Sequence, residues 1–322
     1  MWNFFSRRAS RGAHANAAAP LIPAPAAAAL AAMPLPAEPD LDARFSARLL
    51  DVELADPAEI ARAERALLTR LEDLNRAGLA SGLVSRLPVT LPRLLTLVRR
   101  DDVSNRELAA HLARDTALLG EVIRLANSPR YRGQGRIANL EAAVQLLGQS
   151  GLQQLVSRVL MGPVFNRQQG HFSRSASTHL WAHAERCALA CAFLRLGQAD
   201  HFDAYLAGML ANAGLIAALR VLDQDYLAPV LSSSPQFHAA LIEVTARLSV
   251  HIAGLWDFPP SVVEALQLRA RREAPPRPGS LAADLLRADR LAKLHLLGLP
   301  APASLAADEQ RCWQELQRVF SP

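Results

Sequence analysis

The side chains best placed for chemistry are a histidine and two cysteines spaced along one predicted helix. His183, Cys187 and Cys191 follow one another at intervals of four residues, so they share one helix face. Imidazole and thiolate groups are ligands that zinc prefers, but zinc takes about four of them and the sequence signals no others nearby. Free cysteine also behaves as a small buried hydrophobe. We therefore interpret this face as protein core, and we treat His179, four residues before His183, in the same way.

A second polar feature is an asparagine inside an apolar stretch. Residues 204–219 carry no formal charge and are rich in Ala and Leu, which are strong helix formers, so we expect one buried helix that is too short to cross a membrane. Gly208 and Gly214 each cost about 1 kcal/mol relative to alanine in a helix interior, which indicates close packing or a turn. The amide of Asn212 must be hydrogen-bonded there, because an unpaired buried amide costs on the order of 1–3 kcal/mol.

Signatures of several common enzyme and binding classes are missing from the sequence. It contains no glycine-rich phosphate loop, no Gly-x-Ser-x-Gly motif and no Cys-x-x-Cys pair. Three cysteines are an odd, sparse set, which argues against a disulfide framework and favours a reducing cytoplasm. The net charge of +5 includes Arg7, Arg8 and Arg11 near the N-terminus, so the rest is nearly neutral and nucleic-acid binding is not expected. We attribute the single lysine, Lys293, to composition alone.

The elements that would position these groups are helices throughout. Residues 1–40 are rich in Ala and Pro, lack periodicity and predict a disordered arm. From residue 41 apolar residues recur three and four apart, and no alternating strand pattern of any length is found, so we predict an all-α protein. The expected helices cover residues 41–52, 60–74, 92–98, 104–112, 115–126, 140–147, 152–160, 177–191, 204–219, 237–255, 261–271, 281–296 and 306–320.

Short motifs recur in a fixed order between residues 87 and 296. They are Leu87-Pro88, Ala113-Arg114-Asp115, Arg124-Leu125-Ala126-Asn127-Ser128, Leu147-Gly148, Leu180-Trp181 with His183, Ala207-Gly208-Met209-Leu210 with Gly214, and Trp256 with Phe258-Pro259. In this order they resemble the HDOD family, the HD-related output domain of bacterial signalling proteins. The resemblance implies an HD-like helical domain of two packed lobes, 87–160 and 177–296, within residues 81–296. Residues 41–80 would add a helical segment before the domain, and residues 297–322 a helix after it.

The resemblance also implies where a metal centre would lie. HD phosphohydrolases bind divalent metal through a His, an adjacent His-Asp pair and a later Asp, and use it to activate water. By motif, His183 stands at the first His and Asp289 at the last Asp, while the central pair falls on Ala211 and Asn212. Ala211 has no ligand atom and a neutral amide is a poor substitute for a carboxylate, so these positions are degenerate. We therefore expect no metal, no cofactor and no catalytic residues.

The function expected from this resemblance is that of a non-catalytic regulatory or scaffolding domain in bacterial signal transduction. It would bind a protein partner, with a small nucleotide as a candidate ligand. The candidate binding residues are Asn127, Ser128, Trp181, Arg269, Arg271 and Arg272.

Two alternatives stay open. One is an HD-type phosphohydrolase or phosphodiesterase with a relocated metal set, for instance His179, His183, Asp203 and Asp289. The other is a nucleotide- or nucleic-acid-binding regulator that uses the arginines of residues 269–277, a run that more often forms a solvated face.

Overall fold

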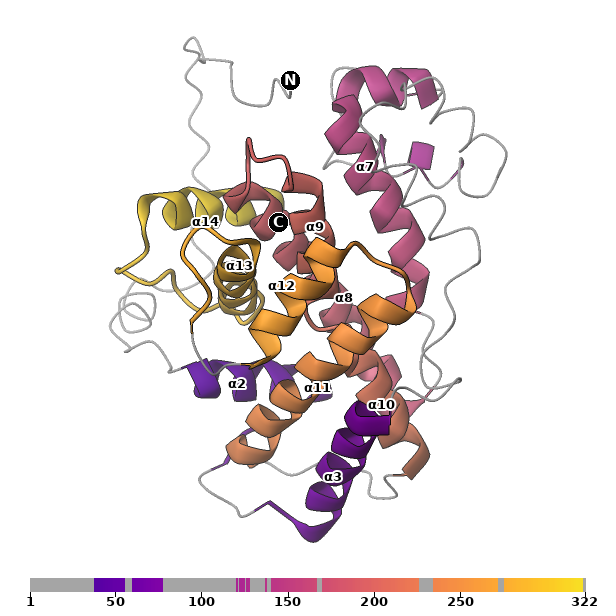
Figure 1. Cartoon of the computed structure of the whole chain (residues 1–322), viewed down its shortest axis with the longest axis vertical. Coiled ribbons are helices and arrows are strands. Elements are labelled where there is room, and N and C mark those ends of the chain that lie inside the picture. The colour runs from indigo at the N-terminus through magenta and orange to yellow at the C-terminus, as the bar shows by residue number, and fades with distance from the viewer. Residues whose placement is uncertain are drawn as a thin grey trace, which may run out of the picture.

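The computed structural model describes residues 38–55, 60–77, 140–166, 170–225, 234–271 and 275–320, with single positions or short runs at 120, 122–124, 126–127 and 137. Within these residues the regular structure is entirely helical, which confirms the predicted all-α class (Figure 1). The helices are α2 (Glu38–Leu50), α3 (Arg62–Ala77), α7 (Leu140–Asn166), α8 (His171–Leu194), α9 (His201–Leu210), α10 (Gly214–Asp225), α11 (Pro235–Leu255), α12 (Pro260–Arg271), α13 (Leu281–Leu296) and α14 (Ala307–Phe320). The helices expected at 92–98 and 104–112, and residues 1–37 of the arm, lie outside the described residues.

Helix α8 is the element around which the others pack. It contacts α2, α7, α9, α10, α13 and α14, and it runs behind α11 and α12 through the middle of the molecule in Figure 1. Its predicted core face is buried as expected, including Leu180, Ala184, Cys187 and Cys191. Small residues on this face allow neighbouring helices to approach closely, so α8 can bring side chains from several of them together.

Helix α8 begins earlier than its periodicity predicts, at His171 instead of residue 177. The reason is a cap supplied from far along the chain. The carboxylate of Asp223 accepts hydrogen bonds from the backbone N–H groups of Phe172 at 2.7 Å and Ser173 at 3.3 Å. These are orphan donors of the first helical turn, which any helix must satisfy. A cap that lies 51 residues away in the sequence is invisible to a local pattern.

The prediction of one helix over residues 204–219 is wrong, because the stretch forms α9 and α10 with a turn at residues 211–213. The expected close packing of its glycines is confirmed. A Cβ on Gly208 would lie 2.5 Å from the Cys187 carbonyl oxygen, and one on Gly214 would lie 1.9 Å from that of Thr245. The Gly214 N–H donates to Ser249 Oγ at 2.9 Å instead of continuing a helix. The turn places Asn212 at a buried position between α9 and α10.

One stretch of the described chain has the length and apolar composition of a membrane-spanning helix. It covers His201–Gln224, and 94% of its most apolar window is buried inside the protein. Burial of this extent is typical of core helices, and the turn at residues 211–213 interrupts it.

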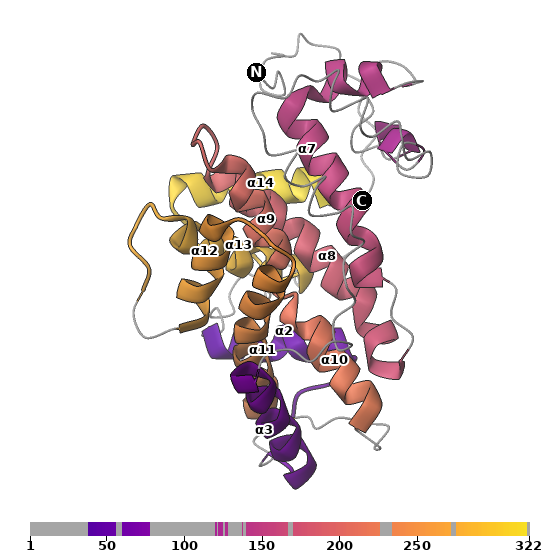
Figure 2. The ribbon, with the colours of Figure 1, turned by 45° about the vertical axis from the view of Figure 1, so that its right-hand side comes forward.

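Helices α2 and α3 contribute to the same core. Helix α2 packs against α8, α11 and α13, with Phe45 completely buried, and α3 lies beside α10 and α11 (Figures 1 and 2). Residues 41–50 therefore help to build the centre of the molecule. Where the domain boundaries lie, at residue 81 in particular, stays a prediction.

The remaining helices largely follow their predicted ranges. Helix α13 covers the expected residues, and its N-terminus is capped by Ser280, whose Oγ accepts from the Ala283 N–H at 3.2 Å. In α7 the backbone breaks at Gly148, which has a φ of 65°, a conformation that favours glycine. The expected second break at Gly151 is absent, and α7 continues to Asn166. Helix α14 packs on α8 and α13.

Candidate functional site: a buried ion cluster

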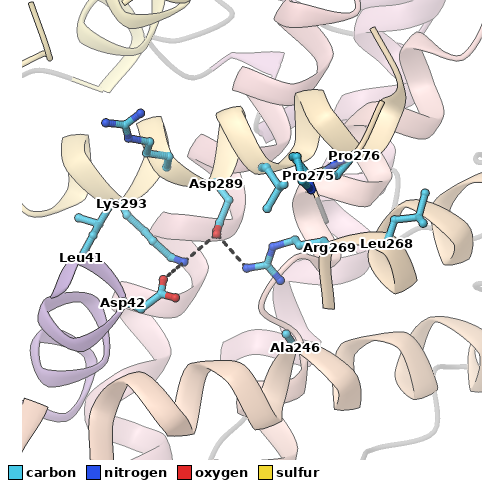
Figure 3. Close-up of a pocket in the computed structure, with 11 residues that line it drawn as sticks. Leu41, Asp42, Ala246, Leu268, Arg269, Pro275, Pro276, Asp289 and Lys293 are labelled. Atoms are coloured by element: carbon cyan, nitrogen blue, oxygen red, sulfur yellow. Dashed lines mark hydrogen bonds and ion pairs between the residues drawn. The ribbon is translucent and has the colours of Figure 1, made fainter. Parts of the chain in front are cut away.

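Six polar side chains from five parts of the fold meet beside α8. They are Asp42 of α2, His183 of α8, Asn212 of the turn between α9 and α10, Arg269 of α12, and Asp289 and Lys293 of α13; we refer to them as the buried ion cluster. Each is at most 5% exposed. The four HD-type positions named from the sequence all fall here, since Ala211 adjoins Asn212 in the turn. Figure 3 shows Asp289 between Arg269 and Lys293, with Lys293 reaching on to Asp42.

Asp289 is the centre of the cluster. Its Oδ2 lies 2.8 Å from Nη2 of Arg269 and 2.7 Å from Nζ of Lys293. Its Oδ1 accepts a hydrogen bond from the Asn212 amide at 2.9 Å. Burial alone would raise the pKa of Asp289, but the two neighbouring cations hold that pKa well below its usual value. The carboxylate is therefore ionised, and its charge is balanced by protein side chains.

Lys293 connects this centre to α2. Its Nζ lies 2.6 Å from Oδ1 of Asp42, 251 residues away in sequence, and 5.3 Å from the centroid of the Phe45 ring. Burial lowers the pKa of a lysine, but Asp289 and Asp42 outweigh burial and the pKa of Lys293 is raised. The single lysine of the chain thus holds α2 against α13, which the composition-based interpretation missed. A lone lysine four residues after Asp289 in a predicted core helix was the available signal.

Arg269 holds the turn that contains the degenerate pair. Its guanidinium donates to the Ala211 carbonyl at 2.7 Å and to Oδ1 of Asn212 at 3.1 Å. The nearby carboxylate of Asp289 raises the pKa of Arg269 against the opposing effect of burial. Arg269 is thus not part of a solvated face, and its role as a binding residue stays a prediction. Helix α12 extends to Arg271, and its inward face includes Leu266, Arg269 and Ala270.

His183 completes the cluster as a neutral imidazole. Burial lowers its pKa, and the contact with Asp289 opposes this only in part. Nε2 lies 3.1 Å from Oδ1 of Asp289, but outside hydrogen-bonding alignment, and Nδ1 lies 3.5 Å from the Asn212 amide nitrogen. The Phe45 ring packs against the imidazole, with centroids 4.6 Å apart. His183 is thus held by packing as much as by polar contacts.

The donor set at this position does not suit a divalent metal. His183, Cys187 and Asp289 do place ligand atoms within 4.8 Å of one another. However, burial raises the pKa of the Cys187 thiol well above its usual value, so a metal would first have to displace its proton, because metals bind the thiolate. Two buried cations also contact the carboxylate that would have to balance the charge of the metal. Arg269 and Lys293 supply the positive charge that a metal ion would bring.

The relocated metal set is not assembled. Among the described residues, the ligand atoms that converge include His183 and Asp289 but neither His179 nor Asp203. Asp203 instead accepts a hydrogen bond from the Ser261 hydroxyl on α12. His179 is only partly buried, and its pKa is lowered by that burial and by Arg48. The structure thus gives the enzymatic alternative no complete ligand set in the described part of the chain.

The other candidate binding residues serve packing or lie elsewhere. The Asn127 amide donates to the Ile137 carbonyl at 2.8 Å and accepts from the Ile137 N–H at 2.8 Å, so it joins two backbone segments. Trp181 packs on Phe165 of α7, with ring centroids 5.4 Å apart. Arg271 is exposed. Ser128 and Arg272 lie outside the described residues.

A cavity of about 390 Å³ opens beside the buried ion cluster (Figure 3). Five of its lining residues are charged, namely Asp42, Arg269, Asp289, Arg290 and Lys293. Its apolar wall includes Leu41, Leu268, Pro275 and Pro276. We call it the ion-cluster cavity.

Comparisons with known proteins identify the family of this chain. Residues 84–271 match the HDOD domain family. A Treponema pallidum protein described only as uncharacterized is 25% identical over 198 residues, which are 57% of this chain, and the match spans only 37% of that relative's length. The family match ends before α13, so Asp289 and Lys293 lie beyond it, as does Asp42 at the other end.

Solved structures show the same fold. An HDOD domain protein of unknown function from Geobacter sulfurreducens has a TM-score of 0.54 at 20% identity, covering 80% of this chain and 89% of that one. A candidate metal-dependent phosphohydrolase from Shewanella amazonensis has a TM-score of 0.59 at 18% identity, covering 80% and 99%. A candidate signal transduction protein from Marinobacter aquaeolei has a TM-score of 0.54 at 19% identity, covering 83% and 66%. At these identities the likeness shows the fold and leaves function to the site itself.

Proposed function

This chain belongs to the HDOD domain family, and from that premise we propose that it is a non-catalytic regulatory or scaffolding domain in bacterial signal transduction. The observation that carries the proposal is the environment of Asp289. The carboxylate at the last HD-type position already contacts a guanidinium and an ammonium group, at 2.8 and 2.7 Å. A domain whose metal position is filled by its own side chains acts by binding other molecules.

The buried ion cluster gives such a domain a fixed shape. It joins α2, α8, α12, α13 and the turn after α9 through contacts that each need defined geometry. Buried ion pairs contribute little net stability, since desolvation offsets their attraction, but in some proteins they disfavour alternative packings. We infer that the cluster holds the helices in one arrangement, so that the outer surface of the domain is presented to a protein partner in the cytoplasm.

Metal content tests the non-catalytic half of this proposal. We expect purified full-length protein to contain iron, manganese and zinc well below one per chain, and to leave a panel of phosphodiesters and nucleotides unhydrolysed with added Mg²⁺ or Mn²⁺. Stoichiometric metal that is lost on His183→Ala, together with turnover lost in the same variant, would overturn it. Glu264→Gln, an exposed carboxylate on α12, is the matched control.

A reconstruction sharpens this test. The double variant Ala211→His with Asn212→Asp restores the missing central pair of an HD site. We expect both this double variant and the single variant Asn212→Asp to remain inactive, because Arg269 and Lys293 still contact Asp289. Hydrolysis by the double variant would show that the missing pair was the sole obstacle, and the two cations would then lose the role proposed for them.

The regulatory half needs a partner. Crosslinking of the full-length chain in a bacterial host, compared with a form lacking residues 1–40, is expected to identify a signalling protein as a reproducible neighbour. A chain that crosslinks to no protein in either form contradicts a scaffolding role. A crosslink that forms with the full-length chain but not with the form lacking residues 1–40 would show that the arm binds the partner.

The second candidate function is an HD-type phosphohydrolase. The convergence of His183, Cys187 and Asp289 within 4.8 Å is the observation in its favour. The protonated thiol and the two cations weigh against it, and the metal analysis above separates the two functions.

A further inference from the structure

A second cavity, of about 800 Å³, lies apart from the buried ion cluster. It is bounded by α7 where Gly148 breaks the helix, the C-terminal end of α8, the start of α9, and α14. It shares no lining residue with the ion-cluster cavity. We call it the amide-lined cavity, because Gln149, Gln154 and Gln198 contribute to its wall. Its volume is within the roughly 300–1,000 Å³ range of pockets that hold small molecules.

The wall of the amide-lined cavity carries no net charge. Glu315 and Arg318 of α14 line it, and they neutralise each other through a hydrogen bond of 2.8 Å from Nε to Oε2. Burial lowers the pKa of His201, the remaining titratable group, so it is neutral at pH 7. A strongly anionic or cationic ligand would find no unbalanced partner charge here, so an uncharged ligand suits the wall best.

The apolar part of the wall favours a flat ring. Leu189, Phe193 and Leu196 line the cavity, and Leu196 is 59% exposed although leucines are usually covered. Phe193 is only partly buried, which leaves aromatic surface available to a ligand. Aromatic rings stack on such surfaces with their faces offset.

The polar part of the wall has unmet hydrogen-bonding capacity. Gln154 is 8% exposed, and its side-chain amide has no hydrogen-bond partner among the described residues, although its backbone carbonyl accepts from Tyr205. The buried Nδ1 of His201 has no hydrogen-bond partner in the described part of the chain. The buried Nδ1 of His201 costs free energy while it lacks a partner, so it points to a molecule that supplies one, and the Gln154 amide has no hydrogen bond with a described residue to give up on binding such a molecule.

We propose that the amide-lined cavity binds an uncharged aromatic heterocycle with a donor and an acceptor side by side on its edge, the chemistry of a purine nucleoside. Its ring face packs on Phe193 and its edge hydrogen-bonds the amide of Gln154, which offers both a donor and an acceptor. This site goes beyond the function proposed above, since it stands whether or not the buried ion cluster is inert.

Ligand-observed NMR and titration calorimetry on the full-length protein test this inference. The probes are adenosine and guanosine, with adenosine 5′-monophosphate as a charged comparison and naphthalene as an apolar one. We expect at least one nucleoside to bind with a Kd below about 1 mM, and to bind more tightly than the monophosphate and than naphthalene. Absence of nucleoside binding, or tighter binding of the monophosphate or of naphthalene, would overturn the proposal.

Two variants locate the site. Gln154→Leu is expected to weaken nucleoside binding at least tenfold. Ala199→Trp, which places an indole at an exposed lining position, is expected to abolish it. Glu264→Gln should bind as wild type, and thermal melting should show all three variants folded. Unchanged nucleoside affinity in the folded Ala199→Trp protein would show that the nucleoside binds outside the amide-lined cavity and would contradict the proposal. Metal content and hydrolysis play no part in these readouts, so the two proposals fail independently.

Discussion

The ion-cluster cavity and the amide-lined cavity differ in how their polar groups are paired. In the ion-cluster cavity, Asp289 contacts Arg269, Lys293 and Asn212 at 2.7–2.9 Å, and the charges balance within the protein. In the amide-lined cavity, the buried Nδ1 of His201 has no partner among the described residues, and the Gln154 amide makes no hydrogen bond to any of them.

This difference indicates which polar side chains are available to hydrogen-bond a ligand. Side chains that satisfy one another are part of the structure, and removing one of them costs stability. Side chains that lack a partner cost stability while the site is empty, so removing one of them should cost little and should reduce ligand binding. The following predictions test whether the polar side chains of the ion-cluster cavity stabilise the fold and whether those of the amide-lined cavity contribute little to it.

The largest effect is expected for Asp289→Asn. This change keeps the shape of the side chain but leaves Arg269 and Lys293 without the carboxylate between them. Breaking a buried ion pair from one side costs about 3–5 kcal/mol, and we expect that loss in the free energy of unfolding measured by urea denaturation. Glu264→Gln serves as control, with a change below about 0.5 kcal/mol. A loss below about 1 kcal/mol in Asp289→Asn would show that the cluster is not structural.

A smaller loss is expected for Lys293→Met, which keeps much of the packing against Phe45 and removes the charge. Asp289 retains Arg269 in this variant, so we expect about 2–4 kcal/mol. The double variant Lys293→Met with Asp42→Asn should lose less free energy of unfolding than the two single variants lose in sum, because the two residues share one contact of 2.6 Å. Additive losses in this double-mutant cycle would show that α2 is not held by Lys293.

The pH dependence of stability is the third test. Burial lowers the pKa of His183, so below its ordinary pKa of about 6.5 the unfolded chain takes up a proton that the folded protein does not. The free energy of unfolding therefore falls as the pH drops from about 6.5, by up to about 1.4 kcal/mol per pH unit for this residue.

His183→Gln should reduce this slope. Part of the slope remains, because burial also lowers the pKa values of His179, His201 and His295. The measurement is chemical denaturation at several pH values between 5 and 7. An identical slope in wild type and variant would contradict a neutral, buried His183.

The smallest effect on stability is expected for Gln154→Leu in the amide-lined cavity. An amide without a protein partner contributes no hydrogen bond to the fold, so its removal should change the free energy of unfolding by less than about 1 kcal/mol and could increase it. Thermal and urea denaturation without ligand provide the value. A loss of the size expected for Asp289→Asn would mean that the two cavities do not differ in the way described.

Much of this protein follows from its sequence. Helices with local signals follow their predicted ranges closely, such as α13, predicted over residues 281–296, and α11, predicted over residues 237–255 and observed at Pro235–Leu255. The degenerate pair at Ala211 and Asn212, and the positions of His183 and Asp289, also came from the sequence, because motif order and residue identity suffice for them. These features depend on residues that are close together along the chain or on the types of single residues.

Only the tertiary structure decided how the degenerate site is filled. The contact between Lys293 and Asp42 joins residues 251 positions apart, and Arg269 enters the cluster because the packing of α12 against α11 and α13 turns its face inward. The early start of α8 depends on Asp223 in the same way, and the turn at residues 211–213 depends on close packing of Gly214 against α11. Burial and charge balance are properties of the packed chain, because each partner is supplied by a distant segment whose position the local sequence does not encode.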